Sequence, residues 1–277
     1  MSPQAPWTSL RVVPSGDAAV VSAALFAAGS QGVLEDGGAL VSHFPTRAEA
    51  EWAATAVQRV DPRAEVALGE VAPVDWAEAW KHHVRAFDCG VLTVTPPWLV
   101  GDRDPATTIV IEPGMAFGTG DHPTTRGVLR LLPATIRPGD RVADLGAGSA
   151  VLAIGAAKLG AGRVAAVELD PEAIADAEAN VAANGVGDRV TVLEADAVVA
   201  LPLIAPVRVI IANIISSVLV ELLPAMRDAL AADGEAILSG ILHDERAGLL
   251  DVLAAKGWRV TAEDTERPWW SCRIARA

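Results

Sequence analysis

The chain has 277 residues, 51% of them hydrophobic, and a formal net charge of −13. This length is typical of one large domain or two smaller ones, with enough apolar residues for a buried core. The acidic balance disfavours nonspecific binding to nucleic acid, whose phosphates attract clustered Lys and Arg. Cys89 and Cys272 match no metal-ligand spacing, so we expect reduced thiols and no metal site. No basic segment precedes an apolar stretch at the N-terminus, and we expect no signal peptide and a cytoplasmic location.

The first seventy or so residues predict a small α+β domain. We expect strands at 7–13 and 64–71, a hairpin across 32–44, and helices at 17–28 and 46–60. Asp17 is a candidate cap of the first helix, and Thr46 begins a capping box at the second. The order β-α-β-β-α-β is typical of a ferredoxin-like domain, which we place at residues 1–71. Nothing in this domain indicates catalysis, so we expect it to serve recognition or packing.

Residues 72–90 are expected to link this domain to a second one at residues 91–277. Within them Pro73–Phe87 predicts a short helix, with Trp76 and Trp80 at helical spacing. We favour the interpretation that the two indoles pack against a domain face. Strands are expected at 91–94 and 107–111, before the main sheet begins.

Strand and helix patterns alternate from residue 141 to the C-terminus, which is typical of a doubly wound α/β sheet. We expect strands at 141–145, 163–167, 189–193, 207–211 and 235–238, and helices at 151–159, 172–183, 216–231 and 244–256. The apolar segment Leu201–Met226 is divided by prolines and charged residues, so it predicts a strand and a helix rather than a membrane span. A terminal hairpin at 258–274 would make the last strand antiparallel.

A glycine turn follows the strand at 141–145. Gly146 and Gly148 allow backbone N–H groups to approach a ligand where the next helix begins. Glu168 ends the following strand, about twenty residues later, where a Rossmann-type fold places the acid that binds two ribose hydroxyls. Strand, turn, helix, strand and acid together predict a nucleotide site.

The spacing of small residues favours S-adenosylmethionine over NAD in this site. The dinucleotide pattern requires Gly or Ala at position 151, which is Val151. The methyltransferase pattern, acid-x-Gly-x-Gly-x-Gly, begins at Asp144 and departs only at its third glycine, which is Ala150. We expect the methyl group of Ala150 to lie near the methionine part of the donor and to weaken its binding modestly.

Two further polar residues follow strands of the predicted sheet. Asp196 follows the third strand, where it can meet the adenine amino group, although an exposed loop aspartate is an ordinary finding. Asn213 follows the fourth strand, and its side-chain oxygen can accept a hydrogen bond from an amine and orient the lone pair. A helix cap is the alternative role for Asn213, because Asn caps helices readily.

The second informative stretch is the glycine-rich loop at residues 111–122, which ends at a helix expected from Pro123 to Leu132. A loop that ends at a helix N-terminus beside the cleft can close over a cofactor. We do not expect His122 to bind a metal, because no second His or Cys stands at ligand spacing.

The loop sequence Glu-Pro-Gly-Met-Ala-Phe-Gly-Thr-Gly-Asp-His-Pro-Thr-Thr, residues 112–125, closely resembles the hallmark of the PrmA family, the methyltransferases of ribosomal protein L11. Asp-Leu-Gly-Ala-Gly-Ser at 144–149, Ala-Asn-Ile at 212–214 and the tryptophan motifs at 75–98 are similar to that family in the same order. The resemblance covers residues 73–277 through motifs, and residues 1–70 through size and predicted topology. It differs at Ala147 and Ala150, where the family usually has Cys and Gly, and at Glu168, where it usually has Asp.

The resemblance implies a class I S-adenosylmethionine-dependent methyltransferase domain of Rossmann-like α/β fold, preceded by the ferredoxin-like domain. It implies N-methylation of lysine side chains and the N-terminal amine of a basic large-subunit ribosomal protein, presented by the N-terminal domain. Motif matching assigns cofactor contacts at Thr125, Gly146, Glu168 and Asn213, with Phe117 and Thr119 in the closing loop. We add Gly148 and Asp196 to the cofactor site, and Asn213 as the residue that orients the amine.

Two alternatives stay open at this point. The chain could methylate lysines of another protein, since related enzymes share the loop and the glycine turn. It could also bind S-adenosylmethionine without turnover, although Thr125, Glu168 and Asn213 weigh against this. We expect no direct nucleic-acid or membrane partner, and a monomer. We name no general base, because deprotonation of the amine can run through water.

Overall fold

The computed structural model describes residues 7–30, 32–71, 84–114, 117–118 and 120–277. The chain divides into two compact units, Met1–His83 and Val84–Ala277. Most of the helix expected at Pro73–Phe87 lies outside the described residues. The two units are each described by themselves below.

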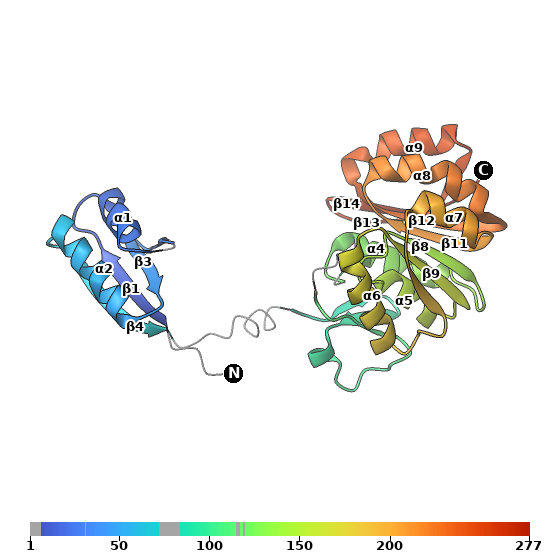
Figure 1. Cartoon of the computed structure of the whole chain (residues 1–277). Helices are drawn as coiled ribbons and strands as arrows, with labels where there is room; N and C mark the ends of the chain where they lie inside the picture. Colours follow the sequence, from blue (N-terminus) through green and yellow to red (C-terminus); the bar gives the residue numbers. More distant parts are fainter. Residues whose placement is uncertain (1–6, 31, 72–83, 115–116, 119) are drawn as a thin grey trace. The chain divides into compact units, whose positions relative to one another are not determined.

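The N-terminal unit is a four-stranded antiparallel sheet with two helices on one face (Figure 1). Its elements are β1 (Trp7–Val13), α1 (Ala18–Ala27), β2 (Leu34–Asp36), β3 (Ala39–Phe44), α2 (Arg47–Val60) and β4 (Glu65–Val71). The strand order β2-β3-β1-β4 is that of a ferredoxin-like domain, as expected from the sequence. Asp17 caps α1 by accepting from the Ala19 amide, and Thr46 and Glu49 form the predicted capping box of α2.

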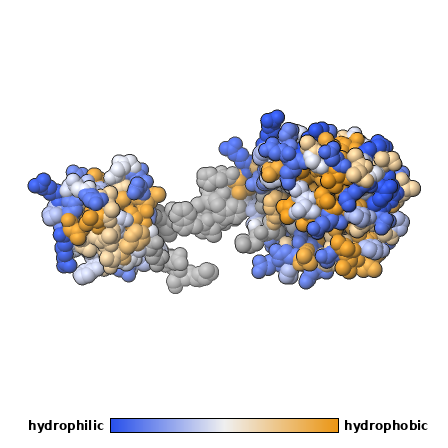
Figure 2. All heavy atoms as spheres, turned by 90° about the horizontal axis from the view of Figure 1, so that it is seen from above, coloured by the Kyte–Doolittle hydropathy of each residue, from blue (hydrophilic) through white to orange (hydrophobic). Residues whose placement is uncertain are grey.

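Buried and exposed side chains alternate along β1, and the buried ones form the core of this unit. Leu10 and Val12 point to the helices and are fully buried with Phe44 of β3, whereas Trp7 and Val13 are exposed on the other face. Burial of such side chains supplies the main stabilising free energy of a small domain. Apolar side chains also remain on the surface of this unit, and Figure 2 shows such hydrophobic residues in orange.

The C-terminal unit is organised around a seven-stranded sheet of order β10-β9-β8-β11-β12-β14-β13. Its strands are β8 (Arg141–Leu145), β9 (Arg163–Glu168), β10 (Val190–Glu194), β11 (Val207–Asn213), β12 (Leu230–Leu242), β13 (Trp258–Glu266) and β14 (Trp269–Arg276). The first five strands in the order are parallel, and β14 pairs antiparallel with both β12 and β13. The expected antiparallel last strand is therefore present.

Helices cover both faces of this sheet (Figure 1). One face carries α4 (Pro123–Leu131), α5 (Val151–Lys158) and α6 (Pro171–Ala183), and the other carries α7 (Ala197–Ile204), α8 (Ser216–Ala229) and α9 (Arg246–Ala255). Each layer has its own buried cluster of aliphatic side chains. Strands β8 and β11 lie inside the sheet and are almost entirely buried, which agrees with their mostly apolar sequences, whereas the edge strand β10 is largely not buried.

A second, three-stranded sheet precedes the large one. It consists of β5 (Phe87–Cys89), β6 (Leu92–Thr95) and β7 (Thr108–Val110), in the order β5-β6-β7. Residues 87–89 are therefore a strand that pairs with β6, not the end of a helical linker. Short 3-10 turns lie at Pro97–Leu99, Leu132–Ala134 and His243–Glu245.

Two further elements, α7 and β12, differ from the expectation from the sequence. Helix α7 was not expected, because Pro202 stands inside it and breaks the helical pattern. Its N-cap is Asp196, for which the sequence predicts a contact with the adenine amino group but no cap. Strand β12 is also longer than predicted, since Gly234 and polar residues interrupt its apolar run. None of the described helices is both long and apolar enough to cross a membrane.

Candidate functional site

The glycine turn connects β8 to α5 through left-handed backbone conformations. Gly146, Gly148 and Ala150 have φ angles of 71°, 51° and 63°. Glycine adopts this region without steric cost, whereas a residue with a side chain costs roughly 1–2 kcal/mol there. The sequence therefore places glycine at two of the three positions, and Ala150 carries the strain at the third.

The side chain of Ala150 is fully buried in the core cluster that surrounds α5. A buried methyl group in this layer does not line the cleft above the turn. The expectation that this methyl group lies against the donor is therefore not met.

The glycine-rich loop rests on the turn. The Ser149 amide donates to the Phe117 carbonyl at 2.9 Å, and the Ser149 hydroxyl donates to the Gly118 carbonyl at 2.7 Å. A Cβ atom on Gly148 would collide with the Phe117 carbonyl oxygen. Glycine at position 148 therefore permits the contact between the two sequence motifs.

The carboxylate of Glu168 is held in place by three backbone amides. Oε2 accepts from the Gly148 amide at 2.8 Å, and Oε1 accepts from Leu169 and Asp170 at 2.7 Å and 2.9 Å. An ionised carboxylate offers about four lone-pair sites, so a further acceptor position stays available to a hydroxyl group. The acid is thus tied to the turn and oriented at the carboxyl end of β9.

A cavity of about 300 Å³ opens at the carboxyl ends of β8, β9 and β10, where open α/β sheets bind ligands. Gly146, Glu168 and Asp196 line it, so the structure brings three of the predicted site residues together. Leu169 and Val198 also line it and are 66% and 53% exposed. A flat apolar ring placed there would cover these side chains.

Among the lining residues that the sequence did not predict, four lie on α8 or just before it: Ile214, Val218, Glu221 and Leu222. Their signal was the spacing of residues 214, 218 and 221–222, which places them on one face at the start of the helix after β11. The same helix had been treated only as a covering element.

Asp196 contributes to the cavity from the start of α7. Its Oδ1 accepts from the Val198 amide at 2.7 Å and caps the helix. The other carboxylate oxygen has no hydrogen bond to the described residues. The side chain can thus cap α7 and still accept from an amino group in the cavity.

Asn213 ends β11 beside Ser239 of β12 and is half-buried. It does not line the cavity, but its neighbour Ile214 does. The alternative role as a helix cap is not found, because the N-cap of α8 is Ile215 and no side chain caps that helix. The side-chain amide of Asn213 forms no hydrogen bond with the described part of the chain.

The start of α4 lies beside the loop. His122 caps this helix by accepting a hydrogen bond from the Thr124 amide. Its ring packs edge-on against those of Phe117 and Trp269, with distances between ring centroids of 5.3 Å and 4.9 Å. The hydroxyl of Thr125 is buried and has no hydrogen-bond partner among the residues that the structure describes, so it can still bond to a ligand group. Phe117 is exposed, and Thr119 lies outside the described residues.

Asp144 of β8 holds the first turn of α5 beside the glycine turn, a role that the sequence pattern does not predict. Its Oδ2 accepts from the Ala153 amide at 2.9 Å, whereas its buried Oδ1 has no hydrogen-bond partner in the described part of the chain. Burial raises the pKa of Asp144 to about 7; the Ala153 bond lowers it and the nearby Glu168 charge raises it further. A buried acid therefore fixes the first turn of α5 next to the glycine turn.

Comparison with known proteins decides the family. The family model of ribosomal protein L11 methyltransferase (PrmA) matches residues 14–277. The chain belongs to this family. Family membership identifies it as a methyltransferase, in agreement with the seven-stranded sheet and its antiparallel β14.

Individual members of the family show the extent of the similarity. The chain is 38% identical over 245 residues to the ribosomal protein L11 methyltransferase of Thermus thermophilus, covering 88% of this chain and 90% of that one. It is 41% identical over 210 residues to the Pelotomaculum thermopropionicum protein of the same name, covering 75% and 68%. The crystal structure of ribosomal protein L11 methylase from Lactobacillus delbrueckii subsp. bulgaricus superposes with a TM-score of 0.61 at 30% identity, covering 70% and 99%.

Proposed function

We propose that this chain transfers methyl groups from S-adenosylmethionine to amino groups of ribosomal protein L11, on lysine side chains and the N-terminal amine. Family membership supports the substrate protein. The observation that supports S-adenosylmethionine as the cofactor is the cavity lined by Gly146, Glu168 and Asp196 at the carboxyl ends of three parallel strands.

The residues in this cavity fit S-adenosylmethionine. Glu168 has one acceptor position left for a ribose hydroxyl, and the second oxygen of Asp196 can accept from the adenine amino group. Leu169 and Val198 offer apolar surface to the adenine ring. The buried, unpartnered hydroxyl of Thr125 and the glycine turn are available to the methionine part.

The donor supplies an electrophilic methyl group, so the protein contributes mainly orientation and exclusion of water. The Asn213 side chain forms no hydrogen bond with the described residues, and its oxygen can accept from the substrate amine and direct the lone pair towards the methyl group. A lysine, whose pKa is ordinarily about 10.4, must first lose a proton. Desolvation under the loop lowers that pKa, and water can carry the proton away.

The N-terminal unit is proposed to recognise the substrate. Residues 7–71 carry eight acidic and four basic side chains, which suits a basic partner through electrostatic steering. One sheet face of this unit is not covered by either of the helices described in it, α1 and α2 (Figure 1), and exposes Trp7, Arg11 and Val13 of the central strand β1. We propose residues 1–71 as the recognition domain, acting with the catalytic domain as a monomer in the cytoplasm. Because β5 (Phe87–Cys89) pairs with β6 and the second compact unit begins at Val84, we start the catalytic domain at Val84 and not at residue 91, and we take residues 72–83 as the linker.

Peptide mapping tests the acceptor groups. Ribosomal protein L11 is incubated with the enzyme and S-adenosylmethionine, digested, and fragmented by mass spectrometry. We expect methyl groups on lysine side chains and on the N-terminal amine. Methylation confined to arginine, glutamine or carboxyl groups would contradict the proposed chemistry. Methylation of an unrelated basic protein at the same rate would favour the alternative that another protein is the substrate.

A further inference from the structure

Three arginines form a row across the amino end of the large sheet, opposite the cofactor cavity. Arg141 and Arg163 begin β8 and β9 and are in register, and Arg189 directly precedes β10. The amide of Val164 donates to the Arg189 carbonyl, which fixes the third position beside the second. Neighbouring strands lie roughly 4.8 Å apart, so the three arginine side chains start from adjacent backbone positions.

Carboxylates neutralise little of this charge. Asp188 is the only acid among the described residues that line the surrounding cavity, and it lies 3.5 Å from Nε of Arg189. Arg141 uses one N–H group to donate to the Ile204 carbonyl at 2.8 Å. The Arg163 side chain forms no hydrogen bond or ion pair with any residue that the structure describes. In a chain of net charge −13, this local excess of positive charge is distinctive.

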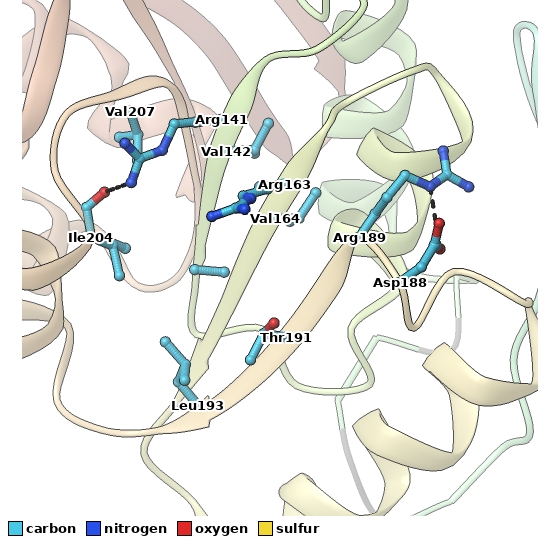
Figure 3. Close-up of a pocket in the computed structure, with 11 residues that line it drawn as sticks. Arg141, Val142, Arg163, Val164, Asp188, Arg189, Thr191, Leu193, Ile204 and Val207 are labelled. Carbon is cyan, nitrogen blue, oxygen red and sulfur yellow. Dashed lines mark hydrogen bonds and ion pairs between the residues drawn. The ribbon is translucent and has the colours of Figure 1, made fainter.

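The row borders a cavity of about 400 Å³ (Figure 3). In this view Arg163 lies between Arg141, which turns to Ile204, and Arg189, which turns to Asp188. The remaining walls combine a hydroxyl group with apolar side chains: Thr191, Leu193, Ile204 and Val207. A volume of this size is at the lower end of the range for small-molecule sites.

We propose that this cavity is a second ligand site, specific for a phosphate group, on the face of the catalytic unit away from the donor. Guanidinium groups bind phosphate oxygens through paired N–H donors, and Arg141 and Arg163 have such donors unoccupied. A bound phosphate removes the repulsion along the row. The apolar wall and the Thr191 hydroxyl provide contacts for an organic body attached to the phosphate.

Calorimetric titration of the full-length protein with two probes tests this site. The probes are inorganic pyrophosphate and adenosine monophosphate, each added after the protein is saturated with S-adenosylhomocysteine. We expect both to bind, and the Arg163→Gln substitution to lower either affinity about tenfold or more. Tighter binding of the nucleotide means that the apolar wall contributes, and equal binding means that the phosphate group alone is recognised.

Arg137→Gln is the matched control, because Arg137 is equally accessible but pairs with Asp233. It should leave the affinity of both probes within about twofold. Both variants should keep the wild-type affinity for S-adenosylmethionine, which shows that the catalytic unit is intact. Absence of binding by the wild-type protein at millimolar probe, or equal losses in the two variants, overturns the proposal. Loss of nucleotide binding in Glu168→Ala but not in Arg163→Gln also overturns it.

Discussion

The amide of Gly148 donates a hydrogen bond of 2.8 Å to Oε2 of Glu168. This bond joins the glycine turn after β8 to the acid at the end of β9. Two motifs twenty residues apart are thereby joined in one structure. Gly148 has no side chain, so its amide is accessible, and the Glu168 carboxylate accepts a hydrogen bond from it. The same carboxylate is the proposed ribose ligand, so its replacement should affect both binding and local stability.

Replacing Glu168 with alanine removes charge-assisted hydrogen bonds to the ribose of about 1.5–3 kcal/mol. We expect the affinity for S-adenosylmethionine to fall roughly ten- to a hundredfold, measured by calorimetry. Glu168→Asp keeps the charge on a shorter side chain and should lose less. Glu172→Ala, on the exposed first turn of α6, is the control. Unchanged donor affinity in Glu168→Ala would refute the assignment.

Asn213→Ala should lower turnover more than donor binding. The Asn213 side chain neither caps α8 nor forms a hydrogen bond with the described residues, so its loss should leave the melting temperature nearly unchanged. Orientation of the amine matters most in the transition state, and kcat should therefore fall while the donor dissociation constant stays near the wild-type value. Equal losses in both quantities would instead assign Asn213 to cofactor binding.

Asp144 should make stability depend on pH. Its pKa in the folded chain, about 7, lies above the unfolded value of about 3.9, so the folded state binds the proton more tightly. The stabilising contribution is complete below the unfolded pKa and is lost as pH rises through about 7. We expect the melting temperature of the wild type, relative to Asp144→Asn, to decrease between pH 5 and pH 8.

The exposed Asp102→Asn is the control for this titration. Its difference from the wild type should stay constant across the same range. A constant difference for Asp144→Asn as well would show that the buried carboxyl group does not titrate there.

Ala150→Gly should leave donor affinity within about threefold of the wild type, because the methyl group is buried away from the cleft. Its effect on stability should be small, since relief of roughly 1–2 kcal/mol of left-handed strain is offset by loss of a buried methyl group. Calorimetry and thermal unfolding measure the two quantities. A tenfold gain in donor affinity would restore the expectation that this methyl group crowds the donor.

Deleting residues 1–70 should separate recognition from chemistry. Every proposed donor contact lies in the C-terminal unit, which has its own buried core, so donor affinity should stay near normal. Methylation of folded ribosomal protein L11 should be lost, because the proposed recognition domain no longer raises its local concentration. Methylation by the folded truncated enzyme at the full-length rate would contradict the recognition role.

The elements that the sequence predicted well have local signals. The capping box at Thr46, the Asp17 cap and the glycines of the turn each act within a few residues, and apolar runs mark the buried strands. Helix α7 is not predicted from the sequence because Pro202 interrupts its helical pattern, although Asp196 before it is a typical N-cap residue. The site was predictable where a residue ends a strand, as Glu168 does.

What could not be predicted depends on contacts between distant segments. The sequence places Gly148 in a turn, but only the folded chain shows the Phe117 carbonyl against it. The orientation of Ala150 into the core and the unpartnered oxygen of Asp144 likewise arise from packing around α5. The arginine row appears only when three strands are brought into register.

The most direct test of the proposed function is the intact mass of purified ribosomal protein L11 after incubation with this enzyme and S-adenosylmethionine. The account predicts a shift by one or more methyl groups that is strongly reduced with the Asn213→Ala enzyme at saturating donor. An unchanged mass with an enzyme that binds the donor normally would contradict the account and indicate a binding protein or a different substrate.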